Sequence, residues 1–183
     1  MKPVPLQEWD TTLKHVINDM NGRPLNIHSL MANHPRLLNA WWDLRNYSVN
    51  GGDLEQRHCE LAILRVAVHL DSWYEWAAHV DRGLACGLTL TEIERVTDGP
   101  GADGWTAQEA ALLTAIDDLA ENQAIAESTL QKLHEHFTQQ QVMDMILLYG
   151  MYNTLACMIK TWGLELDADV AERLPDSVTE SSF

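Results

Sequence analysis

The chain has 183 residues, 46% of them hydrophobic, which is enough for one domain with a substantial core. Its 27 acidic residues against 12 Lys and Arg give a formal net charge of −15 at pH 7, a field that repels nucleic acid and anionic membrane surfaces. No long apolar span, signal peptide or disulfide framework is evident among its residues, so we expect a reduced, cytoplasmic protein without nucleic-acid or membrane partners.

Apolar residues at helical spacing dominate the first part of the chain, and no strand-like alternation occurs. Asn, Gly and Pro residues divide this part into three expected helices, over residues 6–20, 26–32 and 35–49. Pro35 stands in the first turn of the third helix, where its missing N–H costs nothing.

The next expected helix is unusually apolar for one that carries charges. Asp53 can cap it, with Gln56 as a partial capping box. Apolar residues surround the helix on nearly all sides, which is typical of a buried helix. Charged residues inside such a helix need a physical reason, and this one holds Arg57, Glu60 and Arg65.

A second helix follows after a very short link, so we expect the two helices to fold back as antiparallel neighbours. It begins at Asp71 or Ser72 and ends near Cys86, before Gly87, which suits a left-handed C-terminal cap. The remaining expected helices cover residues 89–96, 106–121, 128–137 and 138–162.

The predicted fold class is therefore all-α, a compact multi-helix domain around a central antiparallel helix hairpin. We divide the chain into an N-terminal helical segment (1–25), a helical domain (26–174) best defined over residues 26–98, and a flexible tail (175–183).

The hairpin brings together side chains suited to acid–base chemistry. Glu75 and His79 are four residues apart on one helix face, and a carboxylate beside an imidazole fixes the ring and raises its basicity. Glu60 lies about two and a half turns before the link, and His79 about two turns after it, so the two can face each other. We predict a site formed by Glu60, Glu75 and His79, open to a metabolite.

Each member also has a purely structural interpretation. Glu75 could complete a capping box with Ser72, which would turn it away from His79. His79 could be an ordinary hydrogen-bonded core histidine. Glu60 could pair with Arg57 or with a partner chain.

Other candidates near this site are weaker. Trp73 and Trp76 could line a pocket, although packing is the commoner role of such residues. Cys59 is more typical of an inert buried thiol than of a nucleophile, and Tyr152 could add a polar group to a pocket. No metal is expected, because spacing places no third strong nitrogen or sulfur ligand.

The hairpin and its flanks resemble the carboxymuconolactone decarboxylase family, which includes the alkyl hydroperoxidase D-like proteins. The stretches that carry the resemblance occur in order at family-like intervals, at residues 26–28, 33–35, 54–65, 74–79 and 87–93. The resemblance implies an all-helical fold for residues 26–174 and a homo-oligomer with its site near the subunit contacts.

In the hydroperoxidase branch a Cys-x-x-Cys pair precedes a histidine on the same helix, and an upstream glutamate assists as a proton relay. The histidine matches His79 and the glutamate matches Glu60, but the two cysteine positions fall on Ser72 and Glu75. A serine and a carboxylate cannot form the disulfide of a dithiol cycle. We therefore do not expect a dithiol peroxidase.

The decarboxylase branch, which carries Glu and His without the dithiol, implies a carbon–carbon lyase that needs no cofactor and acts on a small organic acid or lactone. We expect His79 to donate a proton, Glu75 to orient it, and Glu60 to relay a proton or stabilise charge. An arginine could hold the remaining anion, the candidates being Arg57, Arg65 and Arg82.

Candidate substrate-binding residues are Ser72, Trp73, Trp76 and Arg57. Two other functions stay open at this point. One is a redox protein that works through a single cysteine, and the other is a non-catalytic oligomeric module of the same fold that binds a small molecule.

Overall fold

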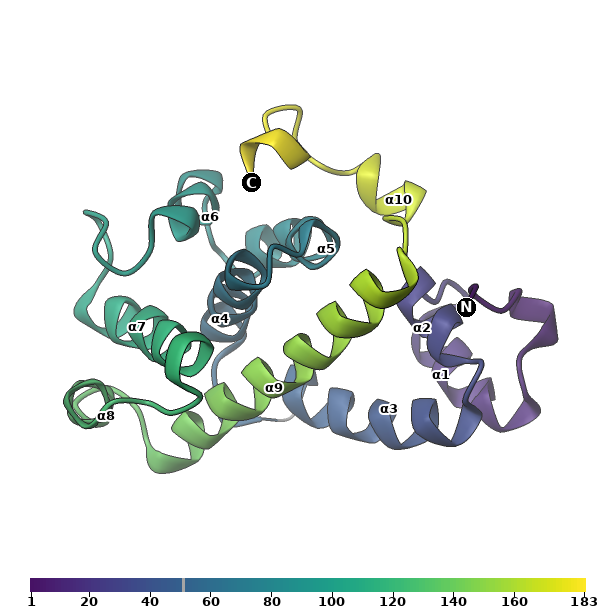
Figure 1. Ribbon diagram of the computed structural model, residues 1–183, viewed down its shortest axis with the longest axis horizontal. Coiled ribbons are helices and arrows are strands. Elements are labelled where there is room, and N and C mark those ends of the chain that lie inside the picture. The colour runs from purple at the N-terminus through teal and green to yellow at the C-terminus, as the bar shows by residue number, and fades with distance from the viewer. Residues whose placement is uncertain (51) are drawn as a thin grey trace.

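The computed structural model describes residues 1–50 and 52–183, apart from the side chains of Asn50 and Ser182, and this part of the chain contains helices and no strand (Figure 1). The predicted all-α fold class is confirmed. The α-helices are α1 (Lys14–Asp19), α2 (Asn26–Met31), α3 (Pro35–Asn50), α4 (Gln56–His69), α5 (Trp73–Ala85), α6 (Leu90–Arg95), α7 (Ala107–Asn122), α8 (Glu127–His134), α9 (Gln139–Trp162) and α10 (Ala168–Ala171). Short 3-10 helices cover Leu6–Glu8, Thr11–Leu13, Val96–Asp98 and Glu180–Ser182.

The predicted hairpin is formed by α4 and α5, at the centre of the molecule (Figure 1). Residues 70–72 make the turn, and Asp71 adopts a positive φ of 47°, which its short polar side chain tolerates better than most. Ser72 is the N-cap residue of α5, but its side chain makes no capping hydrogen bond. The capping box of Ser72 with Glu75, one of the structural interpretations, is therefore not formed.

The hydrophobic core is built around α4, which packs against α5, α7 and α9. Leu61 and Leu64 of α4 are fully buried, as are Leu112 and Ile116 of α7. Burial of each such side chain contributes about 1.5–3 kcal/mol. This packing explains the almost uniformly apolar sequence of α4 and fixes the helix that carries Glu60.

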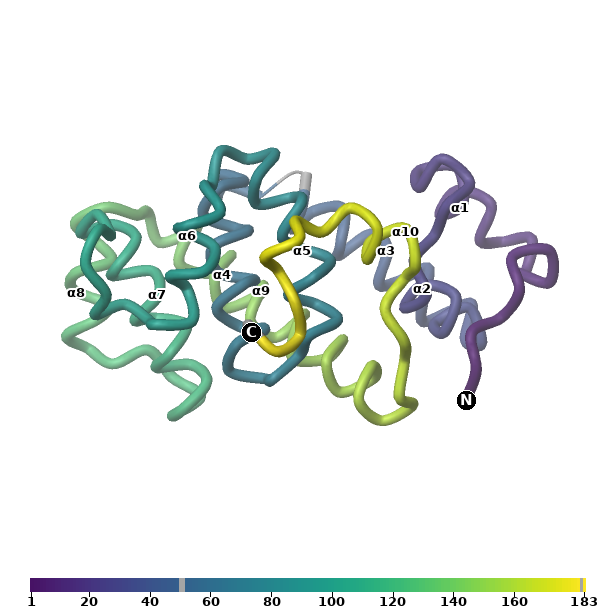
Figure 2. The backbone as a smooth tube through the Cα atoms, turned by 90° about the horizontal axis from the view of Figure 1, so that it is seen from above, coloured from purple at the N-terminus to yellow at the C-terminus, as the bar shows by residue number. Residues whose placement is uncertain are grey.

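By length and composition alone, α9 could cross a membrane. In the structure it lies along α4 and α7, and Met145, Leu148 and Met151 are buried there. Its apolar sequence is thus used for packing in the core of the domain. Figure 2 shows an elongated molecule, with α1 at one end and α8 at the other.

Two local predictions are wrong. The expected helix over residues 6–20 is broken, because Trp9 is extended and the Asp10 carboxylate accepts the Thr12 N–H, which starts a new 3-10 turn. Asp53 does not cap α4; the N-cap is Glu55. The backbone N–H groups of residues 53 and 54 instead donate to the Asp144 carboxylate of α9, a long-range contact that no local pattern encodes.

The last residues, expected as a flexible tail, lie against α5. Val178 is buried, and the Phe183 ring lies 5.1 Å from the Trp76 ring and 6.0 Å from the Trp73 ring, measured between centroids. The tail therefore covers the aromatic face of α5.

Candidate functional site

Glu60 of α4 and His79 of α5 meet inside the hairpin. The carboxylate oxygen Oε2 lies 2.5 Å from Nδ1 of the imidazole, and the two residues are only 5% and 4% exposed. The prediction that these side chains face each other is confirmed. With a carboxylate accepting the Nδ1–H, the ring presents an unprotonated Nε2, the tautomer that accepts a proton.

The surroundings of His79 favour its neutral form. Burial lowers the pKa of His79, the neighbouring Glu60 opposes this, and Arg82 and Arg45 lower the pKa further. A neutral ring is ready to take a proton rather than to give one. The resting imidazole thus differs from the proton donor expected from the sequence.

Glu75 is buried without a partner. The residue is 3% exposed, and within the described part of the chain neither carboxyl oxygen has a hydrogen bond. Burial raises the pKa of Glu75 to about 8; the nearby Ser72 hydroxyl opposes the rise but does not reach hydrogen-bonding geometry. Glu75 therefore carries a proton at pH 7, and Glu60, not Glu75, orients the His79 ring.

Two cavities border this cluster. The larger, of about 240 Å³, is lined by residues that include Ser48, Gln56, Cys59, Glu60 and Cys86. The smaller, of about 40 Å³, is lined by residues that include His28, Tyr74, Glu75, His79 and Tyr152. Arg45 and Arg82 border both cavities. The Glu60–His79 pair thus lies between the two cavities, with Glu60 at the larger and His79 at the smaller. The larger can hold a small molecule, and the smaller can hold about one water.

Arg57, predicted to contact substrate, lies elsewhere and makes three hydrogen bonds. Its guanidinium donates to the Gly87 carbonyl at 2.6 Å, to Glu92 at 2.5 Å and to Glu109 at 2.8 Å. It lines neither cavity. Arg57 is held away from both cavities because α6 and α7 supply carboxylates that the local sequence around residue 57 could not reveal.

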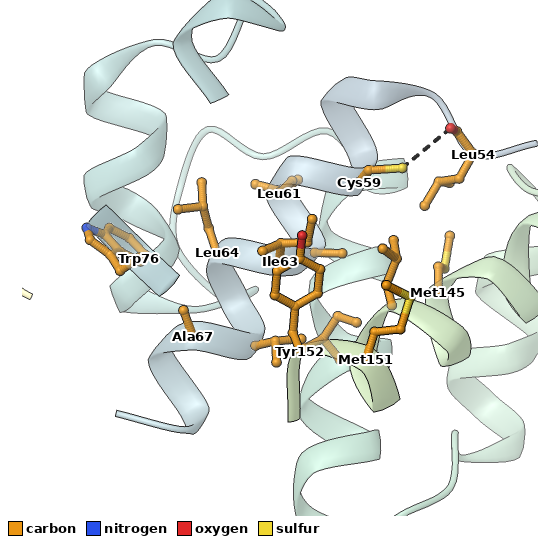
Figure 3. Packing of buried hydrophobic residues seen from close by; sticks show 14 of the residues in the cluster. Leu54, Cys59, Leu61, Ile63, Leu64, Ala67, Trp76, Met145, Met151 and Tyr152 are labelled. Carbon is orange, nitrogen blue, oxygen red and sulfur yellow. Dashed lines mark hydrogen bonds between the residues drawn. The ribbon is translucent and has the colours of Figure 1, made fainter. Parts of the chain in front are cut away.

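The other predicted substrate contacts also lie outside the two cavities. Ser72 and Trp73 border a separate surface pocket beside α9. Trp76 is buried against Phe183 and lies beside Leu64, away from Tyr152 (Figure 3). These aromatic residues pack against the C-terminal tail, which was the commoner of the two roles considered.

Sequence reasoning missed Arg45 of α3. Its guanidinium lies 5.0 Å from the centre of the Trp42 ring, and Nη1 donates to the Asn46 side chain at 3.1 Å. Burial lowers the pKa of Arg45, and the nearby charge of Arg82 lowers it further. The only signal in the sequence was that Arg45 follows Trp41 and Trp42 by one helical turn. This spacing does not indicate which side chains α3 packs against.

Two further cavity residues come from other helices. His28 of α2 accepts the Leu25 N–H through Nδ1, and burial lowers the pKa of His28 to about 3, so the ring is neutral. Tyr152 of α9 packs edge-on against His79 with ring centroids 5.0 Å apart. Tyr152 had been considered as a pocket residue, and it borders the smaller cavity.

Cys59 borders the larger cavity but is a poor nucleophile there. It is buried, its Sγ lies 3.4 Å from the Leu54 carbonyl (dashed in Figure 3), and burial raises the pKa of its thiol to about 12. All three cysteines, Cys59, Cys86 and Cys157, are free thiols. The reactive form of a cysteine is the thiolate, which this environment disfavours at Cys59.

No side-chain group suited to a metal is formed within the described residues, where no three His, Cys, Asp or Glu side chains cluster with metal-binding geometry. The cavities instead present two guanidinium groups, which bind anions.

Solved structures with the same helical arrangement define an AhpD-like fold. An uncharacterized peroxidase-related protein with an alkylhydroperoxidase AhpD core, from Ralstonia eutropha JMP134, matches with TM-score 0.80 and 18% identity over 95% of this chain and 96% of its own. A protein of unknown function from Agrobacterium tumefaciens, suggested to be the antioxidant defence protein AhpD, matches with TM-score 0.69 and 23% identity over 75% of this chain and 95% of its own. A variant of the debrominase Bmp8 in complex with 2,3,4-tribromopyrrole matches with TM-score 0.79 and 12% identity over 93% of each chain.

A family model matches part of the sequence. The model of the Carboxymuconolactone decarboxylase family matches residues 35–118, a stretch that contains α4, α5 and the residues Glu60, Glu75 and His79. Residues 35–118 match this family and the fold is AhpD-like, and both findings confirm the resemblance. No curated protein matches the sequence.

Proposed function

We propose that this chain is an acid–base enzyme that needs no cofactor, a decarboxylase-type lyase acting on a small organic acid or lactone. The observation that carries this proposal is the buried Glu60–His79 hydrogen bond between two cavities that share Arg45 and Arg82. Paired acid–base groups with perturbed pKa values beside a cavity are typical of catalytic sites.

The reaction requires a proton donor and a proton acceptor at carbon. Loss of carbon dioxide breaks the bond between the substrate and its carboxylate, and the electron pair passes into a conjugated carbonyl to give an enolate. A proton must then reach carbon, so the whole reaction consumes one proton and releases carbon dioxide. If the double bond shifts after that protonation, a group must remove a proton from one carbon and return it at another.

The two groups that border the smaller cavity have opposite protonation states, which suits them for these roles. Glu75 carries a proton at pH 7 because burial raises its pKa to about 8. His79 is neutral and can accept a proton. Environments that push two titratable groups apart in this way assign one as acid and the other as base. We assign Glu75 as the donor and His79 as the acceptor, acting on the part of the substrate that reaches from the larger cavity to the boundary with the smaller one.

Glu60 serves the acceptor. Its carboxylate holds the Nδ1–H of His79, so it fixes the ring and stabilises the imidazolium that forms when Nε2 takes a proton. Glu60 also borders the larger cavity and thus connects that chamber with the imidazole. This is the relay role that the family resemblance implies for the upstream glutamate.

The size of the larger cavity favours a small substrate. Its volume of about 240 Å³ lies below the range of ~300–1,000 Å³ of drug-sized ligand pockets. A debrominase of the same fold has been solved with a brominated pyrrole, a small ring compound. Both observations support a small, compact, cyclic molecule as the substrate.

The proposal is tested by incubating the protein with a panel of unsaturated lactone acids and 3-oxo acids and measuring carbon dioxide release. We expect His79→Ala to lower kcat/KM by about 10²–10⁴-fold on any substrate found. His134→Ala removes an exposed imidazole and is the matched control. Full turnover by the His79→Ala variant would remove the basis of the proposal.

The pH profile provides a second test. Activity should rise with pH as His79 loses its proton, below its ordinary pKa of 6.5, and fall again as Glu75 ionises near pH 8. Glu75→Gln cannot ionise, so the fall near pH 8 should disappear along with most of the turnover.

The redox alternative makes a different prediction. A variant with Ser in place of Cys59, Cys86 and Cys157 should keep its turnover if acid–base chemistry is at work. Loss of turnover in this variant, with His79→Ala unaffected, would favour a single-cysteine mechanism. A protein that binds members of the panel and converts none would be the binding module.

A further inference from the structure

Arg45 and Arg82 come from different helices and meet at the same place. Arg45 is on α3, Arg82 is on α5, and both border the larger and the smaller cavity. The charge of each guanidinium acts to lower the pKa of His79 and of Tyr152, and the charge of Arg82 also acts to lower the pKa of Arg45. The fold has therefore brought two like charges to one boundary.

Neither guanidinium is used by the fold in the way that the other interior arginines are. Arg57 and Arg65 each have carboxylate partners within 3.0 Å. The Arg82 guanidinium forms no hydrogen bond or ion pair within the described part of the chain, and the Arg45 guanidinium has only the Asn46 side chain and the Trp42 ring. A guanidinium has five N–H donors, so most donors of this pair are unassigned.

The carboxylates near this pair act on Arg45, whereas Arg82 has no ion pair in the part of the chain that the structure describes. Glu60 lies near Arg45 and offsets one guanidinium, but its carboxylate is engaged by His79. Asp19 also acts on Arg45, although its carboxylate accepts from the Trp42 indole. His28, His79 and Glu75 are neutral at pH 7. A ligand carboxylate would give Arg82 the ion pair that it lacks and use the free donors of both guanidinium groups.

We infer that Arg45 and Arg82 form an anion subsite that binds a carboxylate of a small organic acid at the boundary of the two cavities. Assigning this anion to the substrate rests on the proposed function; the binding itself does not. A chain of net charge −15 repels anions at its surface, so a cationic pair that lines two cavities selects small anions that can enter them.

The chemistry also determines which carboxylate binds here. Two guanidinium groups stabilise a carboxylate in its charged form, and decarboxylation requires that the leaving carboxylate lose its charge. An anion held by Arg45 and Arg82 is therefore one that stays charged throughout the reaction. The substrate is expected to carry an anionic group besides the one that leaves, and the product should keep it.

A matched pair of probes tests the subsite by binding alone. 5-Oxotetrahydrofuran-2-carboxylate combines a lactone with a carboxylate, and its methyl ester has nearly the same shape without the charge. We expect the wild-type protein to bind the acid at least about tenfold more tightly than the ester, measured by NMR titration of the full chain.

Substitutions then locate the charge. Arg82→Gln should weaken binding of the acid at least about tenfold and leave the ester unchanged, and Arg82→Lys should restore part of the loss. Arg45→Gln should act similarly. Because Arg45 packs on Trp42 and its loss can disturb folding, Arg82, which has no such contact, gives the decisive variant. Arg36→Gln removes an exposed arginine of the same helix α3 and is the control.

Equal binding of the acid and the ester, absence of saturable acid binding, or acid binding insensitive to Arg82→Gln would each overturn the inference. These outcomes are separable from those of the proposed function. Acid binding that depends on Arg82, together with turnover that ignores His79, leaves the subsite and removes the lyase. Turnover that depends on His79, together with acid binding that ignores Arg82, does the reverse.

Discussion

Glu60 and Glu75 are two carboxyl groups of one hairpin that are both buried and yet differ in chemical state. Glu60 has an imidazole nitrogen at 2.5 Å, whereas neither oxygen of Glu75 has a hydrogen-bond partner in the part of the chain that the structure describes. Burial without a partner favours the neutral acid, and a hydrogen-bond donor favours the carboxylate. At the residue scale the site is therefore defined by which carboxyl group has a partner, not by burial.

This difference has a measurable effect on stability. The folded-state pKa of Glu75, about 8, is raised above its ordinary value of 4.5, so its contribution to stability is complete below about pH 4.5 and is lost as the pH rises through 8. Glu75→Gln does not titrate. The free energy of unfolding of this variant, relative to that of the wild type, should therefore increase between these pH values, by at most about 1.4 kcal/mol per pH unit.

Urea denaturation of both proteins across this pH range measures the effect. Glu127→Gln removes an exposed carboxyl and should run parallel to the wild type. Parallel curves for Glu75→Gln and the wild type would mean that Glu75 is already ionised in the fold.

At the scale of the element, the first turn of α4 is tied to three other segments by one side chain. Arg57 joins α4 to the Gly87 carbonyl after α5, to Glu92 of α6 and to Glu109 of α7. Glu109 is buried, so it depends on this cation. The contact holds α6 and α7 against the hairpin and thereby supports the helix that carries Glu60.

Arg57→Ala should lower the free energy of unfolding by about 2 kcal/mol, because it leaves the buried Glu109 carboxylate without its cation. Binding of the lactone acid should change little in the folded variant, since Arg57 lines neither cavity. Arg173→Ala removes an arginine whose ion pairs are exposed, and we expect a loss of about 0–1 kcal/mol. Urea denaturation distinguishes the two. Equal losses would show that the Arg57 cluster is no more than a surface contact.

At the scale of the whole molecule, an apolar face spans α3 and α9. Met143 and Ile146 are three residues apart on α9 and are 63% and 46% exposed, and Tyr47 of α3 is 46% exposed and donates to Asp144 between them. Exposed apolar groups gathered in this way are typical of protein interfaces. Together with the homo-oligomer implied by the family resemblance, they support self-association through this face.

We therefore expect the protein to sediment as a homo-oligomer at micromolar concentration. Substitution of both Met143 and Ile146 by Glu should shift it to smaller species without loss of helical content, because it places like charges at the interface. Leu84→Glu alters an exposed apolar residue of α5 and should leave the sedimentation unchanged. A wild-type protein that sediments as a monomer would contradict this expectation.

The sequence by itself determined the helices after residue 25, the hairpin and the meeting of Glu60 with His79. These follow from short-range physics: apolar spacing sets each helix face, the short link at residues 70–72 forces an antiparallel return, and turn counting places the two side chains at one height. The capping box of Thr106 with Glu109 and the left-handed Gly163 are local patterns of the same kind, and both are observed.

Only the tertiary structure decided what surrounds the pair. Arg45 reaches the site from α3 and Tyr152 from α9, whereas Arg57 is drawn away by carboxylates of α6 and α7. The protonation state of Glu75 likewise depends on what excludes water from it. Such contacts join residues far apart in the chain, and their energies depend on burial and charge in three dimensions, which spacing along one helix does not specify.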